Sequence, residues 1–151
     1  MSDRVPAVLV LGVGSELRSD DAAGRRVAEA IAEVAPADVE VRSVHQLTPE
    51  LALDLAGRDQ VVIVDAAVDV ADVTVRRIDP ATVEPAFSHH LDPTALLALA
   101  ARLGAVPRAL TVVSVPAHDL GLGTQLSQAT AAAVIEATTQ VLELTVASGH
   151  A

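Results

Sequence analysis

The sequence contains no cysteine, tryptophan, tyrosine or lysine, and it has a single phenylalanine among its 151 residues. Without cysteine the chain cannot form a disulfide framework, a thiolate metal site or a cysteine nucleophile. Because aromatic side chains are nearly absent, the core must be built from alanine, valine, leucine and isoleucine, which suit helices packed on β-branched strands. The length is sufficient for a stable core, so we expect one domain over residues 1–151.

Positive charge is also scarce, since 10 arginines stand against 20 acidic residues and the formal net charge is −10. Such an acidic chain is poorly suited to bind nucleic acid or an anionic membrane surface. Long apolar runs are missing, so the sequence predicts neither a membrane span nor a signal peptide. We therefore expect a cytoplasmic protein with no nucleic acid or membrane as partner, and we expect it to be a monomer.

Two hydrophobic patterns alternate along the chain. Apolar runs predict strands at 7–12, 39–44, 61–65, 73–78 and 109–115. Helical spacing predicts helices at 20–34, 48–55, 92–104 and 127–144. Only about seven residues separate the third and fourth strands, which is too few for a parallel crossover. The order predicts an α/β fold, a three-layer α/β/α sandwich around a five-stranded, mostly parallel twisted sheet with one antiparallel edge strand.

Local signals predict where several helices begin and which side chains they bury. Thr48-Pro49 predicts an N-cap followed by the first helical residue, and Asp92 before a proline predicts the start of the next helix. In that next helix, spacing predicts that Leu96 and Leu103 face the core. Ser127 is expected to cap the last helix.

The turn Gly12-Val13-Gly14 after the first strand suggests a nucleotide-binding interpretation. Against it, Leu17 stands where the third glycine of the dinucleotide fingerprint belongs, and Asp20 and Asp21 would repel a phosphate at the helix start. The sequence also lacks the G-x-S-x-G elbow of serine hydrolases, and Asp65 is not followed by the Thr/Ser-Gly of pepsin-like proteases.

Acidic and histidine side chains are predicted to gather at the carboxyl ends of the strands, where parallel sheets bind ligands. Asp65 ends a run of four β-branched residues, and His89-His90 precedes a helix. Each acid also has a purely structural explanation. Loop N–H groups could donate hydrogen bonds to the carboxylate of Asp65, and Asp20 and Asp21 could stabilise a helix N-terminus. If two carboxylates and an imidazole converge, they form a nitrogen and oxygen site for a borderline divalent cation.

Five segments, in register, resemble the endopeptidases that mature the large subunit of [NiFe] hydrogenases. They are LVLGVGS at 9–15 with DDAAG at 20–24, HQLTPEL at 45–51, VVIVDA at 61–66, SHHL at 88–91 and GTQLS at 123–127. The family shows a strand with a G-x-G-N turn, an acidic pair opening a helix, a V-D-A strand end and an S-x-H segment. Ser15 replaces the asparagine of that turn, and Ala22 replaces a glycine. The resemblance covers residues 8–144 and implies the phosphorylase/hydrolase-like form of the α/β fold.

This resemblance implies roles for three side chains. Asp21, Asp65 and His90 fall on the metal ligands of the family, and Asp21 and Asp65 are also the implied catalytic carboxylates. His89 occupies a variable position of the motif. The implied metal is the nickel that the precursor already contains, and zinc or cadmium would fit the same site in vitro.

The implied reaction is the removal of a short C-terminal extension from the [NiFe] hydrogenase large-subunit precursor after nickel insertion. An alternative of the same fold stays open, namely a maturation chaperone that binds the metal or the precursor and never cleaves it. The presence of all three implied ligand types favours the enzyme.

Overall fold

A computed structural model describes residues 4–34, 36–80 and 91–149, and within them lies a five-stranded sheet in the order β2-β1-β3-β5-β4. The strands are β1 (Val8–Val13), β2 (Val39–Val44), β3 (Gln60–Ala67), β4 (Thr74–Ile78) and β5 (Leu110–Pro116). All pairs are parallel except that β4 runs antiparallel to β5 at one edge. The predicted topology is confirmed, including the antiparallel strand that the short connection after β3 requires.

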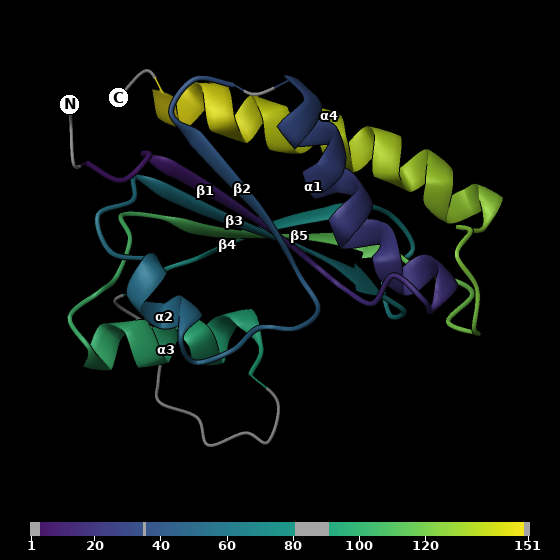
Figure 1. Cartoon of the computed structure of the whole chain (residues 1–151), viewed down its shortest axis with the longest axis horizontal. Helices are drawn as coiled ribbons and strands as arrows, with labels where there is room; N and C mark the ends of the chain where they lie inside the picture. Colours follow the sequence, from purple (N-terminus) through teal and green to yellow (C-terminus); the bar gives the residue numbers. More distant parts are fainter. Residues whose placement is uncertain (1–3, 35, 81–90, 150–151) are drawn as a thin grey trace.

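Helices cover both faces of the sheet (Figure 1). On one face lie α1 (Ala23–Val34) and α4 (Gln128–Gly149), and on the other lie α2 (Leu51–Asp54) and α3 (Pro93–Arg102). This arrangement is the predicted three-layer sandwich. Within the described ranges, no helix has the length and apolar character that crossing a membrane would need.

Two hydrophobic cores, one on each face, hold the layers together. Because successive side chains of a strand point to opposite faces, β1 contributes Val8 and Val10 to the core under α1 and α4, and Leu9 and Leu11 to the core under α2 and α3. All four side chains are buried. Burial on both faces explains why this strand reads as a continuous apolar run, and it leaves the strand ends to carry polar groups.

The predicted helix over 20–34 begins differently from the prediction. A 3-10 turn, η1 (Ser19–Ala22), precedes α1. Ser19 has φ 49°, and its N–H donates to the carbonyl of Gly123 at 3.0 Å. The N–H of Asp20 donates to the carbonyl of Asp119 at 2.8 Å. These backbone groups bind a distant loop, which is why the first turn is not α-helical.

The predicted start of α2 at Thr48 and Pro49 is wrong. The helix begins at Leu51, with Glu50 in the N-cap position and no side chain bonded as a cap. The carbonyls of Thr48 and Pro49 accept hydrogen bonds from the N–H groups of Leu51 and Ala52, each at 3.1 Å. The two predicted capping residues therefore form a turn that leads into the helix.

In α3 the predicted start is confirmed and one predicted core residue is wrong. Asp92 is the N-cap, and its Oδ1 accepts the N–H of Ala95 at 2.7 Å. Leu96 is fully buried as predicted, whereas Leu103 is 51% exposed. The helix ends at Arg102, so Leu103 lies in the C-cap, where helical periodicity no longer directs its side chain.

This difference gives a direct test of the fold. Leu96→Ala should lower the free energy of unfolding by about 2–5 kcal/mol, because it removes a fully buried side chain and leaves a cavity. Leu103→Ala is the matched control and should change it by less than about 0.5 kcal/mol. Urea unfolding followed by far-ultraviolet circular dichroism measures both, and equal losses would contradict this placement of α3.

Candidate active site

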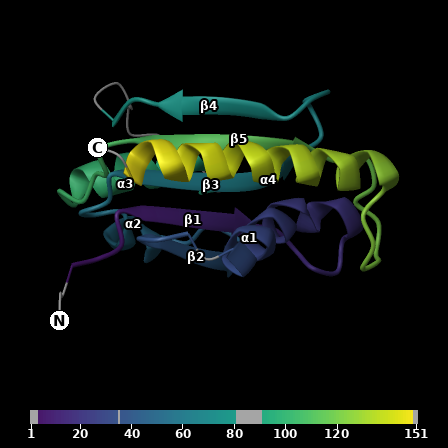
Figure 2. The ribbon, with the colours of Figure 1, turned by 90° about the horizontal axis from the view of Figure 1, so that it is seen from above.

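The carboxyl ends of β1, β3 and β5 meet at one edge of the sheet, here called the carboxyl edge (Figure 2). Two loops lie side by side there: residues 14–18, which follow β1, and residues 117–127, which precede α4. A parallel β-bridge between Arg18 and Gly123 joins them. In parallel sheets this is the edge where ligands bind.

Asp65 stands at this edge, in β3, with Ser114 of β5 as its register partner. Its side chain is partly buried, and its Oδ1 accepts the N–H of Ala66 at 2.8 Å. Burial raises the pKa of Asp65 to about 6 despite that hydrogen bond, and the negative charge of Asp21 contributes to the rise. The N–H of Ala66 thus satisfies Oδ1 without offsetting the cost of burying the charge.

Asp21 lies in η1, close enough to Asp65 for its charge to act there. Its Oδ2 accepts the N–H of Ser15 at 2.9 Å. Two glycines allow this close approach: a Cβ on Gly14 would lie 1.9 Å from the carbonyl oxygen of Asp21, and a Cβ on Gly24 would lie 2.3 Å from that of Val64. The start of α1 is thus pressed against the strand ends, which places Asp21 near enough for its charge to act on Asp65.

Asp20, next to Asp21, is fully buried. Its role differs from the stabilisation of a helix N-terminus that the sequence suggested. Its carboxylate accepts the N–H groups of His118, Asp119 and Ser127 at 2.7–2.8 Å, and the hydroxyl of Ser127 at 2.8 Å. The hydroxyl of Thr130 lies 2.9 Å from Asp20 Oδ2. Burial opposes ionisation, but the hydrogen bonds from Ser127, His118 and Asp119 outweigh it and hold the pKa of Asp20 well below its usual range.

Asp20 therefore fastens η1 to the loop before α4, and it acts as a positioning residue for Asp21. The predicted cap of α4 is part of this arrangement, because the hydroxyl oxygen of Ser127 also accepts the N–H of Thr130 at 3.3 Å. Sequence reasoning missed this link. The available signal was a serine and a threonine at the start of the last helix, and nothing in their spacing points back to Asp20.

The third predicted ligand, His90, lies outside the described residues, as does its neighbour His89. Among the residues that the structure describes, no three histidine, aspartate or glutamate side chains are grouped so that they could hold a metal ion. A metal site built on Asp21 and Asp65 therefore requires a ligand from elsewhere in the chain or from a substrate. His90 stays a prediction.

A polar cavity of about 220 Å³ lies beside the carboxyl edge. The segment before β4, the end of β5 and the first turns of α4 form its walls, which include Asp72, Pro116, His118 and Glu136. The backbone N–H of His118 is one of the donors to Asp20. Neither Asp21 nor Asp65 lines this cavity.

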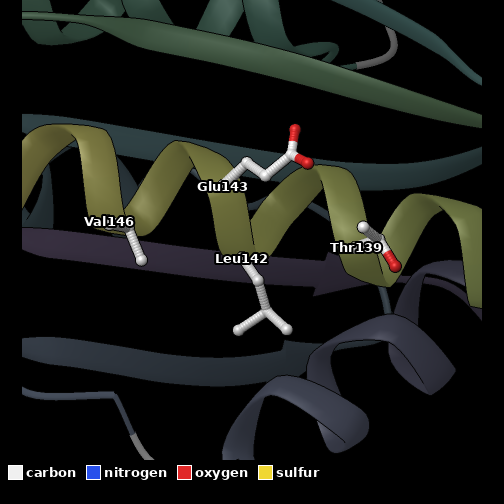
Figure 3. A pocket seen from close by; sticks show the side chains of 4 residues that line it. All are labelled: Thr139, Leu142, Glu143 and Val146. Atoms are coloured by element: carbon white, nitrogen blue, oxygen red, sulfur yellow. The ribbon is translucent and has the colours of Figure 1, made fainter.

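A second, apolar hollow of about 450 Å³ lies on the C-terminal half of α4, away from the carboxyl edge. Its walls are Thr139, Leu142, Glu143 and Val146, and Figure 3 shows these four side chains along a single helix. Glu143 is the single ionisable residue of this lining. The hollow therefore lacks the converging polar groups of a catalytic site.

Comparison with known proteins decides the family. No protein-family model matches the chain. The hydrogenase 2 maturation protease of Escherichia coli strain K12 is 31% identical over 144 residues, which cover 89% of this chain and 88% of the relative. This chain belongs to the hydrogenase maturation protease family. It is therefore an endopeptidase, a hydrolase of peptide bonds, as the resemblance predicted.

Solved structures of maturation proteases share the fold of this one. The hydrogenase maturating endopeptidase HybD from E. coli superposes with a TM-score of 0.79 at 32% identity, over 94% of this chain and 93% of the relative. The [NiFe] hydrogenase maturation protease HybD from Thermococcus kodakarensis gives a TM-score of 0.63 at 26% identity, over 91% of this chain and 97% of the relative. The nucleotide-binding and chaperone alternatives are not favoured.

The role of Asp20 in this maturation protease can be tested by Asp20→Asn. We expect a loss of about 2–4 kcal/mol in the free energy of unfolding at pH 7, because the amide brings an NH₂ group into a site that supplies donors. The pKa of Asp20 is lower in the folded chain than the roughly 3.9 of an unfolded aspartate, so this stability is present above about pH 5 and is lost as the pH falls.

Urea unfolding of the wild type and the variant at pH 7 and pH 3 measures this effect, and the difference between them should shrink at pH 3. Asp69→Asn is the control, because Asp69 is exposed and should give no difference at either pH. A variant as stable as the wild type at pH 7 would show that Asp20 is not an anchor.

Proposed function

We propose that this protease removes the C-terminal extension of a [NiFe] hydrogenase large-subunit precursor after nickel has been inserted into that precursor. The observation that supports the proposal is the pair of carboxylates, Asp21 and Asp65, at the carboxyl edge of a maturation protease fold. The names of the relatives point to the same client, since they include a hydrogenase 2 maturation protease and a [NiFe] hydrogenase maturation protease.

The donor set fits a divalent cation. Asp21 and Asp65 are negatively charged neighbours, both partly buried, and a bound cation would relieve their mutual repulsion. Carboxylate oxygens combined with an imidazole nitrogen suit nickel and also zinc. We assign the imidazole to His90, which follows the S-x-H pattern of the family. The nickel is that of the precursor, so the protease recognises it as part of the substrate.

In this mechanism the nickel of the substrate supplies positive charge next to the scissile peptide bond. Asp65 accepts a proton from the attacking water as the water oxygen bonds to the carbonyl carbon. The same carboxyl then gives that proton to the amide nitrogen as the carbon–nitrogen bond breaks. The hydrogen bond from the backbone N–H of Ser15 holds Asp21 in place beside it.

Nickel dependence tests the proposal. We expect the nickel-loaded precursor to lose its extension and the nickel-free precursor to remain intact, because Asp21 and Asp65 alone do not complete the site. Mass spectrometry of the precursor after incubation with the protease measures the loss. Equal cleavage of both forms would contradict the mechanism, and binding without any cleavage would favour the chaperone.

The ligand assignment has its own test, with two adjacent histidines as a matched pair. His90→Ala and Asp65→Asn should each lower the rate of processing by at least about 100-fold, because each removes a group at the reacting atoms. His89→Ala should leave the rate within about twofold of the wild type. Circular dichroism checks that each variant is folded. If His89→Ala is inactive and His90→Ala is active, the assignment of the imidazole is wrong.

A further inference from the structure

Two leucines at the carboxyl edge are largely exposed to solvent. Leu17, in the loop after β1, is 64% exposed, and Leu122, in the loop before α4, is 92% exposed. Each precedes a partner of the parallel bridge between Arg18 and Gly123, so the two leucines occupy corresponding positions on the paired loops. We call Leu17 and Leu122 the leucine pad.

The backbone that carries the pad is held firmly. The N–H of Gly123 donates to the carbonyl of Leu17 at 3.0 Å, and the N–H of Ser19 donates to the carbonyl of Gly123 at 3.0 Å. The hydroxyl of Ser19 donates to the carbonyl of Gly121 at 2.8 Å. Together with the buried Asp20, these bonds fix both loops before any partner arrives. An apolar surface on a preorganised backbone loses little conformational entropy when it binds.

Charged side chains next to the pad are held by contacts within the chain. Glu16 forms an ion pair with Arg25 at 2.9 Å, and Asp119 accepts the N–H of Gly121 at 2.9 Å. Arg18 donates to the carbonyl of Leu120 at 3.4 Å. The two leucines are therefore an apolar centre on a surface whose neighbouring charged side chains are held by the chain itself.

We propose that the leucine pad docks on an apolar patch of the folded large-subunit precursor, beside the segment that is cleaved. The inference rests on the proposed function. Leu17 is four residues before Asp21 in one continuous segment, and Asp20 fixes that segment to the loop of Leu122. In this proposal, a folded substrate that brings a peptide bond to Asp21 also contacts the two fixed loops that carry the pad.

The test compares two double variants with the wild type on the nickel-loaded precursor of the same organism. Leu17→Gln with Leu122→Gln removes the pad while keeping side-chain size. Leu53→Gln with Ile135→Gln is the matched control, because these residues are 62% and 72% exposed on α2 and α4, away from the two paired loops. We expect the pad variant to raise KM by about tenfold or more with kcat within about twofold, and the control to change neither.

Further outcomes separate this inference from the proposed function. If the wild type processes the precursor and the pad variant has the same KM, the pad is not a docking surface and the proposed function stands. If size-exclusion chromatography shows that the pad variant dissociates a dimer without changing KM, the leucines join two copies of this chain and the inference is overturned. If the wild type does not process the nickel-loaded precursor at all, both proposals are overturned.

Discussion

A single buried carboxylate determines how the carboxyl edge is built. Asp20 accepts hydrogen bonds from groups that follow it by 98 to 110 residues, and so joins the turn after β1 to the start of α4. An ionised group inside the protein is tolerable only if such donors replace its water. These hydrogen bonds hold the backbone of η1 in one conformation. In that conformation Asp21 accepts the N–H of Ser15 and lies near Asp65.

Asp20 and Asp65, both at this edge, have opposite effects on stability. The charge of Asp20 is fully compensated, so it contributes stability. The charge of Asp65 is partly buried next to another negative group and accepts one hydrogen bond, from Ala66, so it is only partly compensated and costs stability. The two hydrophobic cores offset that cost, because the strands that end at this edge are buried on both faces. Stability is thus supplied by the sheet and by Asp20, and the chemistry proposed above is assigned to the pair beside them.

The sequence predicted the features that depend on neighbours in the chain. The antiparallel β4 followed from a short connection, and the cap at Asp92 followed from an acid before a proline. Predictions failed where distant contacts decide the local geometry. The N–H of Asp20 binds the carbonyl of Asp119, so the first turn is not α-helical, and no local pattern could reveal this. The proximity of Asp21 to Asp65 could be predicted because parallel strands end at a common edge. The role of Asp20 could not, because nothing local in the sequence distinguishes it from the adjacent Asp21.

The aliphatic interior also has an optical consequence. Proteins absorb and fluoresce in the near ultraviolet mainly through tryptophan and tyrosine, and this chain has neither. It is therefore nearly transparent at wavelengths where most other proteins are visible. In a mixture with a client that contains tryptophan, the emission belongs to the client alone. Changes in the client's environment during an encounter with this enzyme can then be followed without a label and without background from the enzyme.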